Sequence, residues 1–355
     1  MIICYTKQMK SGLIILTIES TCDETAAAVV TDDLQVLGAV VASQEALHQR
    51  YAGVVPEIAA RAHVERILPV IDAALRQANV KLANLDAIAV ANTPGLAGSL
   101  LVGLAAAKAL CLAAGKPLVA INHLQAHIYA CRIAAQREIF PCVGLIVSGG
   151  HTSLYQCANS TEFEYLGGTI DDAAGEAFDK VASMLGLPYP GGPALSKVAE
   201  TGNAAAYRFP RAMGGRAGGL DFSFSGLKTA VRYALVGPGK PDFSALNLEP
   251  QVVANVAASF QAAVVDTLAQ KSSLAMRQTG QKVLCVGGGV AANRLLRTRL
   301  TDEALQGGWE LHIAPPELCT DNAVMGAIAM ERVKAGKFES LELDILPGLL
   351  RPSSL

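Results

Sequence analysis

The sequence of 355 residues is short of charge. Asp, Glu, Lys and Arg make up 17% of it, against about 25% in an average soluble protein. The two signs nearly balance, with 29 Lys and Arg against 31 Asp and Glu and a net charge of −2. A strongly basic polyanion-binding domain is therefore excluded, whereas a local basic patch is not. Arg294, Arg297 and Arg299 are the candidates for such a patch, with a solvated helix face as the alternative.

Aromatic residues are also scarce, at 5% with a single Trp. Hydrophobic residues nevertheless reach 51%, because small and aliphatic side chains dominate, and Gly occurs 33 times. This composition is typical of Val- and Ile-rich strands packed against Ala-rich helices, and it excludes a disordered or fibrous chain. At about 150 residues per domain, the length predicts two domains or one large α/β unit.

Membrane spans and secretion signals are not apparent, although mean hydropathy is positive at +0.34. The uncharged segment from Thr93 to Ala107 is shorter than the ~20 apolar residues of a spanning helix. A second uncharged segment, 140–161, contains a polar turn. The first eleven residues lack the apolar core of a signal peptide, and Met9 is an alternative start. We therefore expect a soluble cytoplasmic protein without membrane contact.

Cysteine pairs are missing as well. The eight cysteines form no C-x-x-C motif and no zinc-ribbon spacing. Buried thiols are the favoured interpretation in a chain without a secretory signal. Cys22 and Cys319 lie inside polar motifs, so they can line a site without being ligands.

What the sequence does contain is a strand–turn–strand pattern that occurs twice. The predicted strands are 12–18 with 26–30, and 143–147 with 152–157; Ser20 and Ser148 lie in equivalent turns. Helical spacing predicts helices at 56–78, 98–114, 254–276, from 291 onward and 323–334, with short strands at 87–91, 118–121 and 283–286. Loops and short helices are expected between 186 and 228. The pattern predicts two α/β domains of related design.

The sharpest motif is His123-Leu-Gln-Ala-His127. Histidines at i and i+4 share one helix face, where they can bind one metal; the alternative is two polar surface histidines. Leu124 stands where H-E-x-x-H metalloproteases have their general base, so a group for peptide hydrolysis is missing. Asp321 is the best candidate for a third ligand, with helix capping as its alternative role.

Two glycine clusters follow predicted strands. Ser148-Gly149-Gly150 leaves backbone N–H groups free to face an anion, and Gly287-Gly288-Gly289 leads into a helix with Asn293 on its first turn. Each alone is an ordinary turn as readily as a binding loop. Together, at strand ends of a two-domain α/β chain, they favour a nucleotide cleft.

Carboxylates gather in two places. The turn 19–24 contains Glu19, Asp23 and Glu24, and the segment 171–180 places Asp179 near a glycine turn, where a carboxylate can bind a ribose hydroxyl. The alternatives are an ordinary hairpin turn and a solvated acidic helix.

The chain resembles the TsaD (Gcp/YgjD) family from about Gly12 to Gly336, in motifs that occur in one order: IESTCDETAAAVV, TPGLAGSLLVG, HLQAH, VSGGHT, DDAAGEAFDK, YPGGP, LDFSFSGLK, GGGVAAN and CTDNAVMG. The resemblance implies an α/β fold of the actin/Hsp70-like ATPase (ASKHA) type, with two related domains around a nucleotide cleft. The implied domains are 12–122, to which the last helix at about 320–336 returns, and 123–319, followed by an extension at 337–355.

The activity implied by the resemblance is transfer of a threonylcarbamoyl group from threonylcarbamoyl-AMP to N6 of the adenosine 3′ of the anticodon in tRNA, with release of AMP. A TsaB-like paralogue and a TsaE-like ATPase are implied as partners. The alternatives are a metalloprotease, which is an older label of the family, and a non-catalytic ATP-binding regulatory subunit.

The resemblance also implies site residues. The metal ligands are His123, His127 and Asp321, which bind one iron or zinc ion. The contacts to a nucleotide, which is threonylcarbamoyl-AMP, ATP or AMP, are Ile146, Val147, Ser148, Gly149, Gly150, Asp179, Gly192 and Asn293. Asp23 and Glu24 are expected in the catalytic cleft without an assigned role. Ile146 stands where the archaeal and eukaryotic branch has a Tyr ligand, so the chain is similar to the bacterial type.

Overall fold

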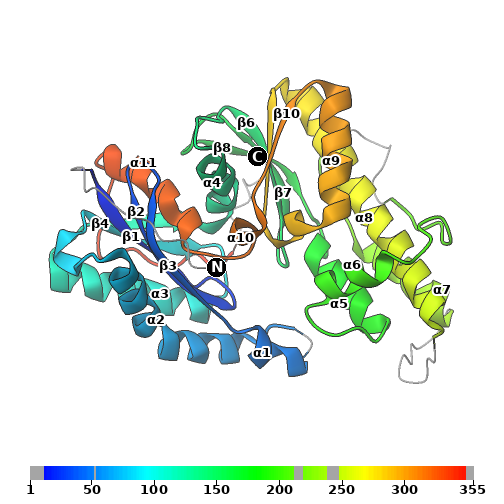
Figure 1. Cartoon of the computed structure of the whole chain (residues 1–355), viewed down its shortest axis with the longest axis horizontal. Helices are drawn as coiled ribbons and strands as arrows, with labels where there is room; N and C mark the ends of the chain where they lie inside the picture. Colours follow the sequence, from blue (N-terminus) through cyan, green and yellow to red (C-terminus); the bar gives the residue numbers. More distant parts are fainter. Residues whose placement is uncertain (1–11, 52, 212–218, 238–247, 349–355) are drawn as a thin grey trace. The chain divides into compact units, whose positions relative to one another are not determined.

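The computed structural model in Figure 1 describes residues 12–51, 53–211, 219–237 and 248–348. It has the predicted α/β architecture, with two five-stranded mixed sheets. Cys4, Met9 and the last seven residues of the predicted C-terminal extension lie outside the described residues.

The chain divides into two compact units. Unit 1 comprises the described residues up to Leu47, the segment Val54–Arg137 and the described residues from Asp321 onward. Unit 2 comprises the described residues of 48–53 and Glu138–Thr320. The helix that carries the paired histidines therefore lies in unit 1 together with Asp321. The domain limits at 122 and 319 that the resemblance implies stay a prediction.

In unit 1 the strands lie in the order β3-β2-β1-β4-β5. β1 pairs antiparallel with β2, and β2 with β3, whereas β4 is parallel to β1 and β5 to β4. The strands are β1 Ile14–Glu19, β2 Glu24–Thr31, β3 Val36–Ser43, β4 Ala87–Thr93 and β5 Leu118–Asn122. The helices are α2 Pro56–Ala78, η2 Leu82–Asn84, α3 Ala97–Ala114, α4 His123–Ala135, η4 Val324–Ile328 and α11 Ala329–Lys334; α1 Glu45–His48 and η1 Gln49–Tyr51 lie at the border of the units.

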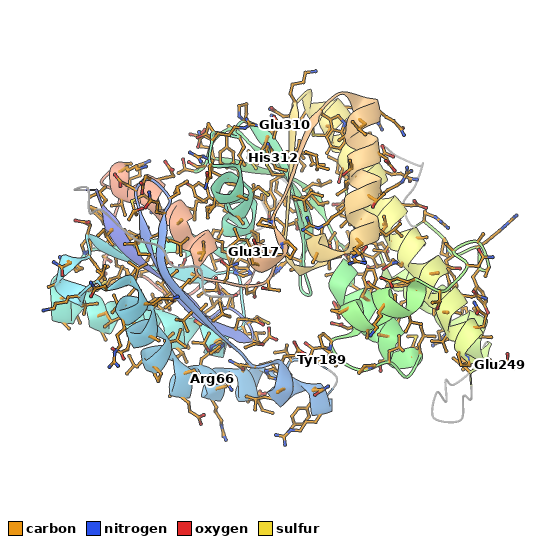
Figure 2. All side chains as sticks on the ribbon, in the orientation of Figure 1. Arg66, Tyr189, Glu249, Glu310, His312 and Glu317 are labelled. Atoms are coloured by element: carbon orange, nitrogen blue, oxygen red, sulfur yellow. The ribbon has the colours of Figure 1, made fainter. Side chains whose placement is uncertain are left out.

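In unit 2 the strands lie in the order β10-β9-β6-β7-β8. The strands are β6 Cys142–Val147, β7 Thr152–Cys157, β8 Phe163–Gly168, β9 Val283–Gly287 and β10 Glu310–Ile313. The helices are α5 Ala174–Met184, α6 Gly191–Ala199, α7 Ser225–Val236, α8 Pro250–Thr279, η3 Gly289–Ala292, α9 Arg294–Gly307 and α10 Pro316–Cys319. Glu310 and His312 lie together on β10 (Figure 2), with 3.1 Å between Oε1 and Nε2.

The two sheets have the same topology, which confirms the prediction of related design. In unit 2, β6 pairs antiparallel with β7, and β7 with β8, while β9 is parallel to β6 and β10 to β9. β6 thus occupies the place of β1, and the turns after these two strands are equivalent. The first turn contains Ser20 and the second Ser148.

Local sequence explains the elements that were predicted most closely. α2 begins at Pro56, whose fixed φ suits a first helical turn, and ends at Asn79 in the left-handed conformation (φ 54°). Its buried face includes Ile67 and Ile71, which join the core of the unit 1 sheet. Burying one such side chain contributes about 1.5–3 kcal/mol, so the amphipathic stripe holds α2 on β2 and β3.

The last predicted helix, 323–334, begins differently. Its first half is the 3₁₀ helix η4, and the α-helix starts at Ala329. The carbonyl of Ala323 accepts from the N–H of Gly326 at 3.1 Å and from the hydroxyl of Thr17 at 2.6 Å. In a regular α-helix the Ala323 carbonyl would accept from the N–H four residues later. Here it accepts from the N–H three residues later and from the Thr17 hydroxyl, which is the hydrogen-bond pattern of a 3₁₀ helix.

Most of the described cysteines, and the longer of the two most apolar helices, lie largely in the core. Among the described residues, six cysteines are buried, Cys22 is half-buried, and none of the seven forms a disulfide. Two helices, α3 and α8, are long and apolar enough to cross a membrane by length and composition alone. In α8, 72% of the apolar window is buried inside the protein, as in core helices of soluble proteins.

Candidate metal centre and nucleotide loops

The paired histidines lie at the start of α4. Asn122, the last residue of β5, caps this helix: its side-chain oxygen accepts from the N–H groups of Leu124 at 3.0 Å and Gln125 at 3.2 Å. α4 therefore begins at His123 itself, and His127 follows one turn later. Both imidazoles are buried, at 4% and 0% exposure, so the alternative of two surface histidines is wrong.

Replacing Asn122 with alanine removes this cap. We expect the free energy of unfolding to fall by about 1 kcal/mol, as for other N-cap deletions. Because the frayed residue would be His123, affinity for zinc should fall as well. Urea unfolding and zinc titration measure the two effects; Asn122→Asp, which keeps an acceptor at the cap, should restore both. Unchanged zinc affinity in a destabilised alanine variant would contradict the link.

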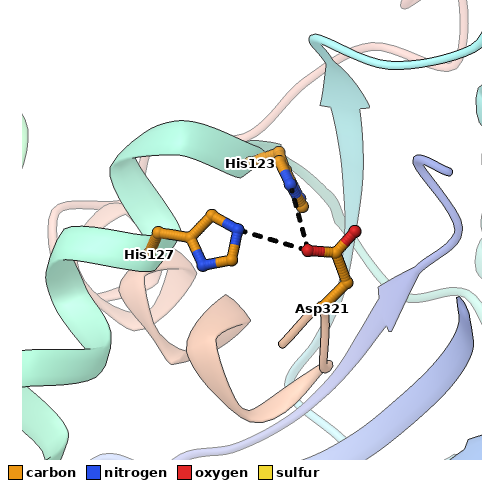
Figure 3. A group of neighbouring side chains, drawn as sticks. All are labelled: His123, His127 and Asp321. Atoms are coloured by element: carbon orange, nitrogen blue, oxygen red, sulfur yellow. Dashed lines mark ion pairs between the residues drawn. The ribbon is translucent and has the colours of Figure 1, made fainter. Parts of the chain in front are cut away.

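Asp321 completes a compact group with the two histidines (Figure 3). Its Oδ1 lies 3.5 Å from His123 Nε2 and 3.3 Å from His127 Nε2. Its neighbour Asn322 accepts at Oδ1 from the N–H of Met325 in the following 3₁₀ helix at 3.1 Å. One potential ligand atom from each of the three residues lies within 4.8 Å of the others.

The donor set fits a divalent cation. Neither ring nitrogen of His127 has a hydrogen-bond partner among the described residues, although both atoms are buried. An unsatisfied buried polar group costs about 1–3 kcal/mol, and a metal bound at Nε2 would remove part of that cost. Two imidazoles and a carboxylate are ligands that suit zinc and iron.

Glu19, at the end of β1, contacts His123 at Nδ1, the ring nitrogen that does not face Asp321. Its Oε2 lies 3.0 Å from His123 Nδ1, and Thr21 Oγ1 lies 3.2 Å from the same nitrogen. Burial disfavours the charged form of His123, but the carboxylates of Glu19 and Asp321 outweigh burial and raise its pKa to about 9. The sequence pattern singled out Glu19 only as one of three acids in a turn; its pairing with a residue about a hundred positions away had no sequence signal.

Asp23 and Glu24 lie in the same turn, close to Asp321. Burial, followed by the charges of Asp321 and Asp23, raises the pKa of Glu24 to about 10. The turn is held by two helices: His63 Nε2 of α2 lies 3.0 Å from the Cys22 carbonyl oxygen, to which the Ser99 hydroxyl of α3 also donates at 3.3 Å. The acids are therefore fixed next to the triad.

In unit 2, the predicted loop Ser148–Gly150 is the turn between β6 and β7. Two of its three carbonyls accept from the first turn of α5: the N–H of Gly175 donates to the Ser148 oxygen at 3.2 Å and that of Glu176 to the Gly149 oxygen at 3.1 Å. Among the described residues, no backbone acceptor receives the N–H of Gly149 or Gly150. Such N–H groups can bind an anion.

Two further predicted contacts, Asp179 and Asn293, both bind α6. Asp179 Oδ1 on α5 accepts from the N–H groups of Gly191 at 2.8 Å and Gly192 at 3.3 Å, so it caps the start of α6. Asn293 caps α9 through the N–H of Leu296 at 3.0 Å, and its Nδ2 donates to Ser196 on α6 and Gln261 on α8. The side chains of both predicted contacts thus order the helix starts around the loop.

The remaining predicted contacts are backbone positions. The side chains of Ile146 and Val147 are fully buried in β6. Gly288, in the second glycine cluster, has φ +95°, and a Cβ there would lie 2.4 Å from the Val147 oxygen. Because β6 and β9 are parallel, both glycine clusters follow the same end of the sheet.

Other charged residues of unit 2 are engaged in structural pairs. Asp172 bridges Lys180 at 2.8 Å and Lys228 at 2.6 Å. Of the three arginines considered for a basic patch, Arg297 donates to the Ala314 carbonyl, and Arg299 pairs with Asp266 and Glu303. Arg294, whose side chain is 92% exposed, lies 3.7 Å from Glu200 Oε1 at the surface.

Comparison with known proteins identifies close relatives. The family model described as "TsaD: tRNA N6-adenosine threonylcarbamoyltransferase" matches residues 35–328. A curated protein of that name from Rhodopirellula baltica is 60% identical over 95% of this chain and 97% of its own length. The protein of the same name from Thermomicrobium roseum is 48% identical over 94% of this chain and 95% of its own length.

Solved structures support the fold. HypF, in a phosphate- and nucleotide-bound form, matches with a TM-score of 0.60 at 15% identity, over 92% of this chain and 47% of HypF. Component A of (R)-2-hydroxyglutaryl-CoA dehydratase from Acidaminococcus fermentans matches with a TM-score of 0.51 at 14% identity, over 91% of this chain and 99% of its own. Both are similar in architecture, which confirms the predicted ATPase-like fold.

Proposed function

The chain belongs to the TsaD family, and from this membership we propose that it transfers a threonylcarbamoyl group from threonylcarbamoyl-AMP to N6 of the adenosine 3′ of the anticodon in tRNA. The adenine amine attacks the carbamoyl carbon, the bond from that carbon to the phosphate oxygen breaks, AMP leaves, and N6 loses a proton. The observation that carries the proposal is the grouping of His123, His127 and Asp321 in a chain 60% identical to a curated protein of that name.

The triad is proposed to hold one iron or zinc ion. When bound, such a metal supplies Lewis acidity and a template that orients the acyl group. The chain's own part is to present two Nε2 atoms and one carboxylate oxygen together on α4 and the segment before η4. Asp23 and Glu24 are proposed to lie beside the reacting groups, held there by the clamped turn.

The glycine loops of unit 2 are proposed to bind the adenylate of threonylcarbamoyl-AMP, and ATP or AMP in the same way. The N–H groups of Gly149 and Gly150 would receive the phosphate, because α5 occupies two of the loop's three carbonyls and leaves these two amides to a ligand. Asp179 and Asn293 support this loop by fixing α6 and α9. Holding the adenylate in one orientation lowers the barrier through proximity and charge stabilisation.

The alternatives are less favoured. A metalloprotease needs an acid beside the metal at position 124, and Leu124 is a buried apolar residue at 2% exposure. A non-catalytic ATP-binding subunit has no use for a metal triad.

Partners and location follow from the family. We propose tRNA as substrate, a TsaB-like paralogue and a TsaE-like ATPase as partners, and a cytoplasmic location. The adjacent helices α2 and α3 expose Val64, Leu68, Leu101 and Leu112 at 50–70%, an apolar surface that suits a protein partner.

The test is a reconstituted transfer. The purified chain is incubated with threonylcarbamoyl-AMP labelled in threonine and with unmodified tRNA, with and without the two partners, and with the chain omitted as control. We expect labelled tRNA and one AMP per transfer only when the chain is present. Absence of label with both partners present would overturn the proposal. Cleavage of a protein substrate would favour the metalloprotease, and ATP binding without any release of AMP would favour the regulatory subunit.

A further inference from the structure

Glu19 uses both carboxylate oxygens within the protein. Oε1 accepts from the backbone N–H of Thr21 at 2.7 Å, and Oε2 lies 3.0 Å from His123 Nδ1. The side chain is only 3% exposed, so its direction is fixed by these two contacts. One buried carboxylate therefore joins the turn after β1 to the first residue of α4.

This contact determines which nitrogen of His123 is free. A carboxylate only accepts, so Nδ1 must carry the proton that joins it to Glu19. In the neutral imidazole the lone pair is then on Nε2, the atom that faces Asp321 Oδ1 at 3.5 Å. Metal-ligating histidines commonly donate their other N–H to a carboxylate, which fixes ring orientation and raises ligand basicity.

The two histidines differ in this respect. His127 has no hydrogen-bond partner at Nδ1 among the described residues, and its ring contacts the triad only through the edge of the His123 ring and Asp321 Oδ1. His123 is anchored before any ligand binds, because the turn that carries Glu19 is itself held by α3. Ser20 Oγ donates to the Ser99 carbonyl at 3.0 Å, and the N–H of Leu96 donates to the Thr21 carbonyl at 2.8 Å.

We propose that Glu19 is the positioning residue of the metal centre: it fixes the Nδ1–H tautomer and the orientation of His123, and so sets the affinity of the triad for its metal. The inference rests on the proposed function, which makes His123 a ligand. Glu19 acts through His123, and both of its oxygens already have partners within the chain.

The experiment measures zinc binding by the full-length metal-free protein, with zinc alone as the probe. Glu19→Ala should weaken zinc binding by about 10–100-fold, as for other outer-shell deletions. Glu19→Gln should lose less, because its amide oxygen can still accept from His123. Ser20→Ala is the matched control: it removes one of the hydrogen bonds that join the turn to α3, but it keeps the backbone bond from Leu96 and both contacts of Glu19, so its zinc affinity should stay near that of the wild type.

A second measurement distinguishes the positioning of His123 by Glu19 from a general loss of rigidity in the turn. In the zinc-loaded wild type, the hydrogen-bonded Nδ1–H proton of His123 should give a downfield NMR signal, identified by its loss in His123→Ala. That signal should be lost in Glu19→Ala and kept in Ser20→Ala. If the alanine variant did not fold, Glu19→Gln would give the same comparison.

The outcomes are distinguishable. Wild-type zinc affinity and a persistent Nδ1–H signal in folded Glu19→Ala would overturn the role of Glu19 and leave the metal centre intact. Equal loss of zinc in Ser20→Ala would also overturn it, since the effect would then belong to the turn. If the wild type bound no zinc or iron, the proposed metal centre would be wrong, and the inference with it.

Discussion

Replacing His127 with alanine is expected to abolish metal binding and to lower the transfer rate on the order of 10³-fold, because a metal supplies several kcal/mol of charge stabilisation. The fold should survive. Neither ring nitrogen of His127 makes a hydrogen bond among the described residues, and Asp321, which lies 3.3 Å from Nε2, keeps its contact with His123 when the ring is removed. The cavity costs stability, and loss of two unsatisfied buried nitrogens offsets part of that cost. Metal analysis, transfer of labelled threonine and thermal unfolding check the three statements.

His312→Ala is the matched control for this prediction. His312 is the histidine of β10 in unit 2, paired with Glu310, and it belongs to neither candidate site. Its removal should leave metal content and transfer unchanged. His123→Ala should also lose metal, but it leaves the buried Oε2 of Glu19 without the histidine that contacts it and should therefore be less stable than His127→Ala. A His127→Ala protein that retained full metal content or full transfer would disprove the assignment.

Elements with strong local signals could be predicted from the sequence. The helix 56–78 matches α2 to the residue, because Pro56 and Asn79 mark its ends chemically. The strand 152–157 matches β7 in the same way. Three strands were missed: β3, β8 and β10, which lie at sheet edges or are half exposed. Their residues alternate weakly, and pairing with a neighbouring strand decides their conformation more than their own propensity does.

In the candidate site, too, residues with a local sequence signal could be predicted, whereas contacts between distant elements could not. The spacing of His123 and His127 is local, so one helix face could be predicted from five residues. Asp321 was a candidate by residue type and by family resemblance, but its proximity to α4 required the fold. Glu19 is the clearest limit: its partner lies on another element, and the sequence marks it only as an acid at the end of a strand.

The nucleotide loop of unit 2 leads to the second large effect. Replacing Gly175 with alanine is expected to weaken binding of threonylcarbamoyl-AMP, ATP or AMP and to lower the transfer rate by about 10²-fold, the loss that a 1 Å misplacement in a site can cause. A Cβ at Gly175 would lie 2.6 Å from the Ser148 oxygen and 2.8 Å from the Gly149 Cα. Both neighbours are backbone atoms, so the loop itself must shift. Isothermal titration with AMP and the rate of transfer measure the loss.

Gly226→Ala provides the matched control, since Gly226 is also the second residue of its helix, α7, and nothing lies within 4 Å of its Cβ position. Alanine there should leave nucleotide binding unchanged and stabilise the protein by about 0.5 kcal/mol, because alanine loses less backbone entropy than glycine in a helix. Alanine has the same entropic advantage over glycine at position 175, so weak binding in Gly175→Ala would not come from a less stable α5. It would come from the shifted loop, which makes the variant a test of whether the Gly149 and Gly150 amides bind the phosphate. Unimpaired AMP binding by Gly175→Ala would place the phosphate elsewhere.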